Sequence, residues 1–351
     1  MAGCGEALPV TLADVEKAAE SIRPYVHETP VLTSEFFNGL SGRSLLFKCE
    51  LLQKTGSFKA RGLMNGVLAA KAKGMRKVVT HSSGNAGQAL AWAARAAGLE
   101  AHIVVPRNAP AVKKAAIQGY GAKMVLCEPS NAAREAMAAK VVEEEGAALV
   151  HPSNDVDVIS GQGTIALELV RQARAHWSGA EPDAVIVPIG GGGMIGGIAA
   201  AIKALLPSCK VLAAEPANAA DAFRSKQAGK IVDHDGPVNT IADGLKTILG
   251  NNTFPIVRDL VDEIFLVEEA AIASATRAVW ERMKLAIEPS AGVGVAVAVS
   301  ATFKEKYPDL RRVAVILCGG NADLAAVGAM LAAAEPLEVS EEPPHKRSKA
   351  T

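Results

Sequence analysis

The sequence predicts an α/β protein with two lobes, each an open, mostly parallel sheet flanked by helices. Two observations lead to this fold class. Short β-branched runs alternate with alanine-rich stretches of helical composition, and the length of 351 residues exceeds what one compact core usually holds. The alternation occurs once over residues 77–152 and again, on a larger scale, toward the C-terminus.

Residues 77–152 form the first series of strands and helices. The strands KVVTHSS, AHIVVP and KMVLCEP are each followed by a helical stretch, and ALVHP ends the series; the helical stretches are NAGQALAWAARAAG, APAVKKAAIQGYG and NAAREAMAAKVVEEEG. Consecutive strand–helix–strand units with right-handed crossovers produce a parallel sheet. We expect residues 77–152 to form a small, mobile domain.

The second series has longer spacing. Its strands DAVIVPIGGGG, KVLAAEP and RRVAVILCGGN are continuously apolar, which is typical of a sheet covered on both faces, and helices are expected over 194–206 and 270–285. Residues 1–76 and 153–335 are expected to form this large domain, and 336–351, rich in charge and proline, a disordered tail. The strand ends of the two lobes should face a ligand cleft.

Composition narrows the class of partner. Acidic and basic residues number 37 each, so no net charge attracts nucleic acid or an anionic membrane. No apolar run is long enough to span a membrane, and the first residues lack the pattern of a signal peptide, so we expect a cytoplasmic protein. The five cysteines show no C-x-x-C pair, which argues against disulfides and zinc. Small molecules are the expected partners.

The stretch VIVPIGGGGMIGG predicts a phosphate site. Four consecutive glycines, Gly190 to Gly193, follow a buried-type strand and begin a helix, so several backbone N–H groups can converge on an anion. The loop lacks the lysine and hydroxyl of a triphosphate loop, and no acidic residue follows at dinucleotide spacing. A nicotinamide dehydrogenase is therefore disfavoured, and a monophosphate is the better fit.

Two further stretches supply reactive groups. THSSGNAGQAL joins a strand to a helix through Ser82, Ser83, Gly84 and Asn85, whose hydroxyls, amide and free N–H groups can bind a carboxylate. KTGSFKARG contains Lys59, which can act as a nucleophile only if burial lowers its pKa. Together, an amine, a monophosphate site and a carboxylate-binding turn can hold pyridoxal phosphate and an amino acid.

The chain resembles the serine racemases and the related serine and threonine dehydratases of the fold type II, tryptophan synthase β-like, pyridoxal-phosphate enzymes. The resemblance is carried by QKTGSFKARG, SSGNAGQALA, PIGGGGMIGG, AAEPANA, ERMKLAIEPSAGVG and CGGNADL, in this order over residues 10–330. It implies a racemase that interconverts L- and D-serine and also eliminates serine to pyruvate and ammonia. A homodimer is implied as well, with ATP as an activator.

The resemblance also assigns residues. Lys59 becomes the Schiff-base lysine, and Ser83 lies across the cofactor from it as the second proton donor. The remaining cofactor residues are Phe58, Asn85 at the phenolic oxygen, Gly190, Gly191, Gly192, Gly193 and Met194 at the phosphate, Gly244, Glu288 near the pyridine end, and Cys318 at the pyridine nitrogen. The substrate residues are Ser82, Ser83, Asn85, Ala86, Arg134 and Ser153. A magnesium or calcium site is implied at Glu215, Ala219 and Asp221, whose oxygen ligands suit these ions.

Three departures from the racemase pattern leave alternatives open. Ala86 stands where the racemases have histidine, Ser153 where asparagine is usual, and Cys318 where the animal racemases have serine. The first two affect the substrate pocket, so a dehydratase of serine, threonine or 3-hydroxyaspartate with little racemisation is the alternative enzyme. A non-catalytic sensor of a phosphate ligand that uses the glycine loop is the alternative from another class.

Overall fold

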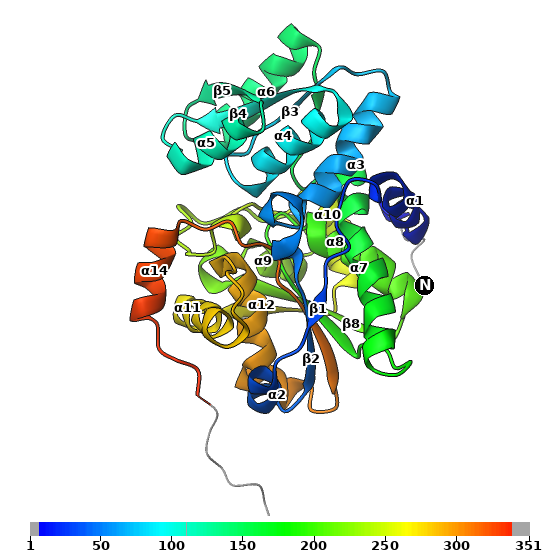
Figure 1. Cartoon of the computed structure of the whole chain (residues 1–351), viewed down its shortest axis with the longest axis vertical. Coiled ribbons are helices and arrows are strands. Elements are labelled where there is room, and N and C mark those ends of the chain that lie inside the picture. Colours follow the sequence, from blue (N-terminus) through cyan, green and yellow to red (C-terminus); the bar gives the residue numbers. More distant parts are fainter. Residues whose placement is uncertain (1–6, 110, 339–351) are drawn as a thin grey trace, which may run out of the picture.

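The computed structural model describes residues 7–109 and 111–338, and in this part the chain forms two separate sheets (Figure 1). The larger sheet has the order β1-β2-β10-β7-β8-β9, and the smaller has the order β5-β4-β3-β6. Only the pair β1–β2 is antiparallel; all other described pairs are parallel. The predicted α/β fold with two mostly parallel sheets is confirmed.

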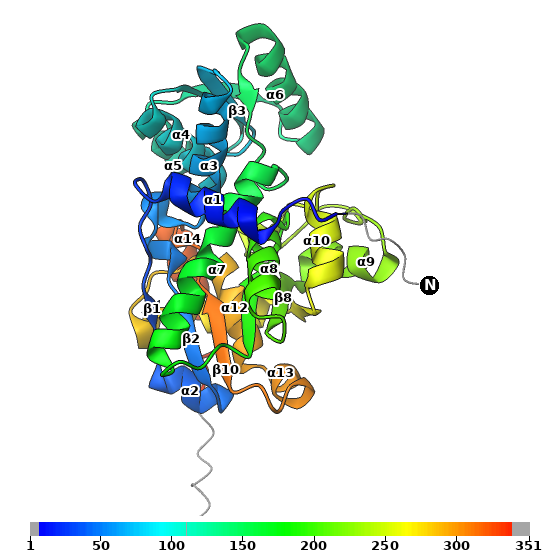
Figure 2. The same ribbon diagram turned by 90° about the vertical axis from the view of Figure 1, so that its right-hand side faces the viewer.

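The large lobe contains the six-stranded sheet with helices on both faces. Helices α1, α7, α8 and α10 cover one face, and α2, α11 and α12 cover the other (Figures 1 and 2). Its strands are β1 (Val31–Leu32), β2 (Ser44–Lys48), β7 (Ala184–Pro188), β8 (Lys210–Pro216), β9 (Glu263–Val267) and β10 (Arg312–Ile316). Its helices are α1 (Leu12–Ile22), α2 (Glu35–Ser41), α7 (Val156–His176), α8 (Gly193–Leu205), α9 (Asp221–Ala228), α10 (Thr253–Leu260), α11 (Glu269–Ala278), α12 (Pro289–Val299), α13 (Ala301–Lys306) and α14 (Leu324–Ala333).

The small lobe follows the predicted strand–helix series. Its strands are β3 (Lys77–Thr80), β4 (Glu100–Pro106), β5 (Lys123–Cys127) and β6 (Ala148–Leu149), and its helices are α4 (Asn85–Ala97), α5 (Ala111–Gly119) and α6 (Asn131–Glu145). Successive side chains of its strands point to opposite faces of the sheet, so buried apolar side chains lie on both faces. Val78 packs with α4, whereas Val79 packs with α6, because successive side chains of a strand point to opposite faces.

Two segments connect the lobes. Helix α3 (Lys59–Ala72) runs from the large lobe into the small one, and residues 150–155 return from β6 to α7 (Figure 1). The apolar side chains of α3, including Leu63, Met64 and Val67, belong to the same buried cluster as Val78 and Leu90 of the small lobe. The predicted domain boundaries stay predictions, and α3 links the two cores.

Several expectations can be compared with the described residues. The strands and helices predicted for 77–152 and the helices near 194–206 and 270–285 are confirmed, the latter continuing through a π-helical turn at Val279–Met283. Strands β2 and β9 and helix α7 were not predicted. Most of the predicted tail, residues 339–351, lies outside the described part, as does Cys4. Within the described part, no helix is long and apolar enough to cross a membrane.

Candidate active site

Lys59 is the first residue of α3 and is held from both sides. Thr55 and Gly56 turn the chain with φ angles of 61° and 74°, and the Phe58 N–H donates to the carbonyl of Cys318 at 3.0 Å. The Lys59 Nζ donates to the Pro152 carbonyl at 2.7 Å and lies 5.1 Å from the centre of the Phe58 ring. The side chain therefore points into the junction between the lobes.

The Lys59 amine has an environment that favours its neutral form. Burial lowers its pKa to about 8, although the nearby Cys318 and Glu288 act in the opposite direction. Its described hydrogen-bond partner is a neutral carbonyl, which accepts an N–H without stabilising the positive charge as a carboxylate would. This is the condition that a nucleophilic lysine requires and that the sequence could not show.

The glycine loop lies at the N-terminus of α8, and its shape leaves no room for side chains. A Cβ at Gly190 would lie 2.9 Å from the Leu245 Cα, and one at Gly191 would lie 2.5 Å from the Ser153 Oγ. Gly192 has φ +79°, which disfavours other residues. Because the first amides of a helix have no acceptor within it, the loop is a backbone site suited to an anion such as phosphate.

The SSGN turn joins β3 to α4, as predicted. Its Gly84 N–H donates to the Ser82 Oγ at 3.3 Å, and Ala86 in the first turn of α4 is buried. A Cβ at Gly87 would collide with the Ser82 carbonyl, so this helix can approach the turn only with glycine there. Ser82 and Ser83 are half-buried, and the turn follows the carboxyl end of a parallel strand, where ligands of α/β folds bind.

Asn85 connects the small lobe to the large one. Its Nδ2 donates to the two carboxylate oxygens of Glu288, at 3.0 and 3.2 Å, and its Oδ1 accepts from Asn321 at 3.0 Å. Glu288 is buried, and Gly244 lies close to it because a Cβ there would be 3.8 Å from Glu288 Oε1. Asn85, Gly244 and Glu288, all predicted cofactor residues, therefore lie close together, and Gly244 has no side chain that would occupy the space beside Glu288.

Cys318 is buried just after the carboxyl end of β10, and its carbonyl accepts the N–H of Phe58, the neighbour of Lys59. Burial raises the pKa of its thiol well above the usual range, so the group is a neutral thiol at physiological pH. All four described cysteines, Cys49, Cys127, Cys209 and Cys318, are buried and unpaired. These four cysteines therefore form no disulfide among the described residues.

A pair of histidines at this edge was missed by the sequence analysis. His81 follows β3 and His151 follows β6, and their rings contact edge to face with centroids 5.0 Å apart. Burial lowers the pKa of His81, and the positive charge of Arg134 lowers it further, so Arg134, a predicted substrate residue, lies near His81. Both histidines lie near the carboxyl ends of the predicted strand segments KVVTHSS and ALVHP, and this shared position was the available signal.

The predicted metal residues form a buried acidic pair. Glu215 and Asp221 are both 0% exposed. Glu215 accepts hydrogen bonds from the amides of Ala222 and Phe223 at 2.8 and 2.9 Å, while the Asp221 Oδ1 has no hydrogen-bond partner in the described structure. Burial, with Asp221 as the second cause, raises the pKa of Glu215 to about 8, and burial raises that of Asp221 to about 7. Two buried carboxylates with an unsatisfied oxygen fit a hard divalent cation.

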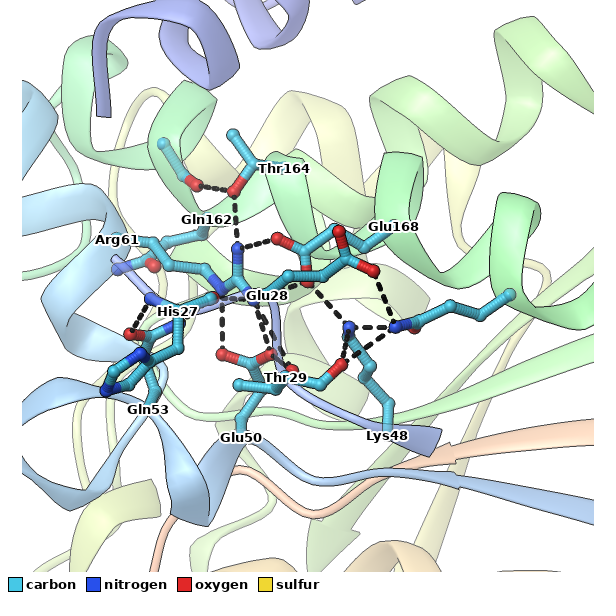
Figure 3. Close-up of polar contacts among 12 residues, drawn as sticks. His27, Glu28, Thr29, Lys48, Glu50, Gln53, Arg61, Gln162, Thr164 and Glu168 are labelled. Carbon is cyan, nitrogen blue, oxygen red and sulfur yellow. Dashed lines mark hydrogen bonds and ion pairs between the residues drawn. The ribbon is translucent and has the colours of Figure 1, made fainter. Parts of the chain in front are cut away.

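A second buried cluster, which we call the ion-pair network, was also missed by the sequence analysis (Figure 3). Arg61, one turn into α3, pairs with Glu50 at 2.8 Å and with Glu168 of α7 at 2.6 Å. Lys48 pairs with Glu168 at 2.6 Å and donates to the Thr29 carbonyl at 2.8 Å. The network joins α3 to β2, α7 and the N-terminal segment. Its α3 member, Arg61, is two residues after Lys59 in the sequence.

Comparisons with known proteins agree with this geometry. Residues 22–319 match the family model described as pyridoxal-phosphate dependent enzyme. The chain is 54% identical to the serine racemase of Homo sapiens over 90% of this chain and 92% of that protein. The structure of maize serine racemase superposes with a TM-score of 0.87 and 43% identity, covering 92% of this chain and 97% of that one. The serine racemase of Dictyostelium discoideum superposes with a TM-score of 0.84 and 45% identity, covering 90% and 100%. The chain belongs to the family of pyridoxal-phosphate dependent enzymes.

Proposed function

We propose that this protein is a pyridoxal-phosphate-dependent serine racemase that also eliminates serine to pyruvate and ammonia. The observation that carries the proposal is the half-buried Lys59 amine, whose pKa burial lowers to about 8. It bonds to the carbonyl of Pro152, whose neighbour Ser153 lies against the loop of four glycines. The named similarity to serine racemases over nine-tenths of the chain supports the choice of substrate. A cytoplasmic homodimer activated by ATP is proposed from the family resemblance alone.

The cofactor would be held at both ends by residues of this chain. The amides of Gly190 to Gly193 and Met194 would bind the phosphate, with the helix N-terminus contributing about 0.3 to 2 kcal/mol. Phe58, Asn85, Gly244, Glu288 and Cys318 would surround the ring. Pyridoxal phosphate, joined to the substrate nitrogen, supplies an electron-withdrawing system that acidifies the α-hydrogen of the amino acid. Because the Cys318 thiol is neutral, it would leave the pyridine nitrogen largely unprotonated.

Lys59 and Ser83 would transfer protons at the α-carbon of the substrate, each on a different face. The Lys59 amine takes the α-proton of L-serine from one face, and the Ser83 hydroxyl gives a proton to the other face, which inverts the centre. If the β-hydroxyl leaves after the first transfer, elimination follows instead. Positioned acid–base groups typically contribute about 10²- to 10⁴-fold each. Ser83→Ala should therefore reduce racemisation more than elimination from L-serine, and racemisation at the parent rate would contradict this role.

The residues expected in the substrate pocket are also compatible with a second activity, that of a dehydratase. Ser82, Ser83, Asn85, Ala86 and Ser153 would contact the amino acid, and Arg134 could pair with a second carboxylate of the substrate. Ala86 is buried and offers only a methyl group, which supports a dehydratase of serine, threonine or 3-hydroxyaspartate as the alternative. A Mg²⁺ or Ca²⁺ ion would be held by Glu215, the Ala219 carbonyl and Asp221 in either case.

Product analysis separates the candidates. Purified protein with pyridoxal phosphate is supplied with L-serine, D-serine, L-threonine and 3-hydroxyaspartate, with and without Mg²⁺ and ATP. D-serine is measured together with the 2-oxo acid that elimination would release, which is pyruvate from serine, 2-oxobutyrate from threonine and oxaloacetate from 3-hydroxyaspartate. A racemase forms D-serine as well as pyruvate from L-serine, and pyruvate alone supports the dehydratase. Borohydride should fix the cofactor on Lys59, and Lys59→Ala should abolish both products. A colourless protein that turns over no amino acid would instead support the phosphate-ligand sensor.

A further inference from the structure

His151 stands at the start of the segment that returns from the small lobe to the large one. It is the second residue after β6, and the Val150 N–H before it still bonds to the Val79 carbonyl at 2.9 Å. The segment Pro152–Asn154 then leads to α7, whose N-cap is Asp155. Val150 is therefore the last residue of this segment bonded to the small sheet, and His151 is the first residue after it.

The His151 ring holds this segment in a tight turn. Its Nδ1 accepts hydrogen bonds from the amides of Ser153 at 3.2 Å and Asn154 at 2.9 Å. Backbone N–H groups can only donate, so Nδ1 carries no proton and the neutral ring bears its hydrogen on Nε2. Burial, followed by the charges of His81 and Lys59, lowers the pKa of His151 to about 4, which keeps Nδ1 available at physiological pH.

Each of the three residues that follow contacts a different part of the site. The Pro152 carbonyl accepts the Lys59 Nζ at 2.7 Å. Ser153 lies against the glycine loop, since a Cβ at Gly193 would be 2.6 Å from the Ser153 carbonyl oxygen. Asn154 accepts from the Asn252 amide at 2.8 Å, which fixes the turn to the large lobe. A change in the turn would therefore displace the lysine partner and the wall of the phosphate loop together.

We propose that His151 is a positioning residue: through its Nδ1 acceptor it shapes the turn Pro152–Asn154 that aims the Lys59 amine and supports the glycine loop. This inference rests on the proposed function, because it assigns His151 a role toward the lysine and the phosphate site of that enzyme. The acceptor, and not the ring itself, performs this role.

Two matched variants separate the acceptor from the ring. His151→Asn keeps a side-chain acceptor that can bond to the amides two and three residues ahead, as asparagine does in Asx turns, but loses the ring packed on His81. His151→Phe keeps a ring and loses the acceptor. Apoprotein of each is mixed with pyridoxal phosphate, and the rate of appearance of the lysine-bound cofactor absorbance, the half-saturating cofactor concentration, kcat and KM are measured.

We expect the two variants to fold equally well but to differ in the rate of cofactor loading and in kcat. His151→Phe should load the cofactor about 10- to 100-fold more slowly, as small misplacements of reacting groups do, and should lower kcat more than it changes KM. His151→Asn should stay within a few-fold of the parent. If His151→Phe does not fold by circular dichroism, His151→Ala, which also lacks the acceptor, must show the same loss.

The opposite order would overturn the proposal. A parent-like His151→Phe, or a His151→Asn as slow as His151→Phe, would show that ring packing or nothing at this position matters. Failure of the proposed function looks different, because the wild-type protein itself would then show no cofactor absorbance and no borohydride label on Lys59. The two failures are therefore distinguishable in the same experiment.

Discussion

Two buried clusters of charge in the large lobe differ in how their charges are balanced. The ion-pair network contains two cations, Lys48 and Arg61, and two carboxylates, Glu50 and Glu168, all within ion-pair distance of an opposite charge. The acidic pair, Glu215 and Asp221, is fully buried and contains two carboxylates. The cation nearest to it among the described ion pairs is His234, 3.5 Å from the Asp221 Oδ1 and charged only when protonated.

The pKa of a buried glutamate is shifted in opposite directions in the ion-pair network and in the acidic pair. Glu50 and Glu215 are both 0% exposed. Burial raises the pKa of each, but the Arg61 guanidinium overcomes this effect at Glu50, whose pKa is lowered, whereas that of Glu215 rises to about 8. A buried carboxylate with its own cation stabilises a scaffold, and one without it is poised to bind a cation from solution.

The largest expected effect is on removal of the central cation of the network. Arg61→Met should lower the free energy of unfolding by about 3 to 5 kcal/mol, because Glu50 would be left buried without its ion-pair partner and Glu168 would keep only Lys48. Urea denaturation measures this. Arg174→Met is the matched control, since Arg174 pairs with Glu181 on the surface and such pairs contribute about 0 to 1 kcal/mol. Equal losses in the two variants would remove the distinction drawn for the network.

Adding a divalent cation should stabilise the acidic pair and leave the network unaffected. Mg²⁺ or Ca²⁺ at 100 times its dissociation constant should raise the free energy of unfolding by about 2.7 kcal/mol through binding to the folded state. Asp221→Asn should abolish the increase, which thermal melting with metal and with chelator can measure.

Glu145→Gln supplies the control for that measurement. Glu100, His102 and Glu145 also form an acidic cluster on the small lobe, but Lys123 and Lys77 already neutralise its carboxylates at 2.7 and 2.6 Å. The cation effect should persist in Glu145→Gln. Loss of the effect there, or its survival in Asp221→Asn, would move the cation site away from the acidic pair.

The pH dependence of stability should also separate the two clusters. Glu215 and Asp221 have folded-state pKa values raised to about 8 and about 7, so the folded protein binds more protons than the unfolded chain from about pH 4.5 to 8. Unfolding free energy in chelator should therefore fall by several kcal/mol as pH rises through this window. The lowered pKa of Glu50 places its loss of stability in acid, below this window. A flat profile in chelator, or the same fall in saturating Ca²⁺, would contradict the comparison.

The contrast between the clusters also marks what the sequence could predict. Lys59, the glycines and the SSGN turn lie in short contiguous motifs, so local pattern and resemblance were enough to select them. Glu215 and Asp221 are six positions apart and came from the resemblance. The network pairs Lys48 with Glu168, which are 120 positions apart, and a single charged residue in a sequence gives no sign of its distant partner. Whether a charge is buried, and with what, is decided by tertiary packing, and the missed strands β2 and β9 carry parts of that packing.

The smallest expected effect tests whether His234 balances the acidic pair. Its Nε2 is 3.5 Å from the Asp221 Oδ1, and the same nitrogen lies 3.1 Å from the Lys246 carbonyl, so its contact with the carboxylate is weak. In chelator, His234→Gln should therefore change the free energy of unfolding by less than about 1 kcal/mol. Urea denaturation beside Arg61→Met gives the scale. A loss as large as that of Arg61→Met would mean that His234 does for Asp221 what Arg61 does for Glu50, and the acidic pair would then be a balanced cluster with no need of a metal.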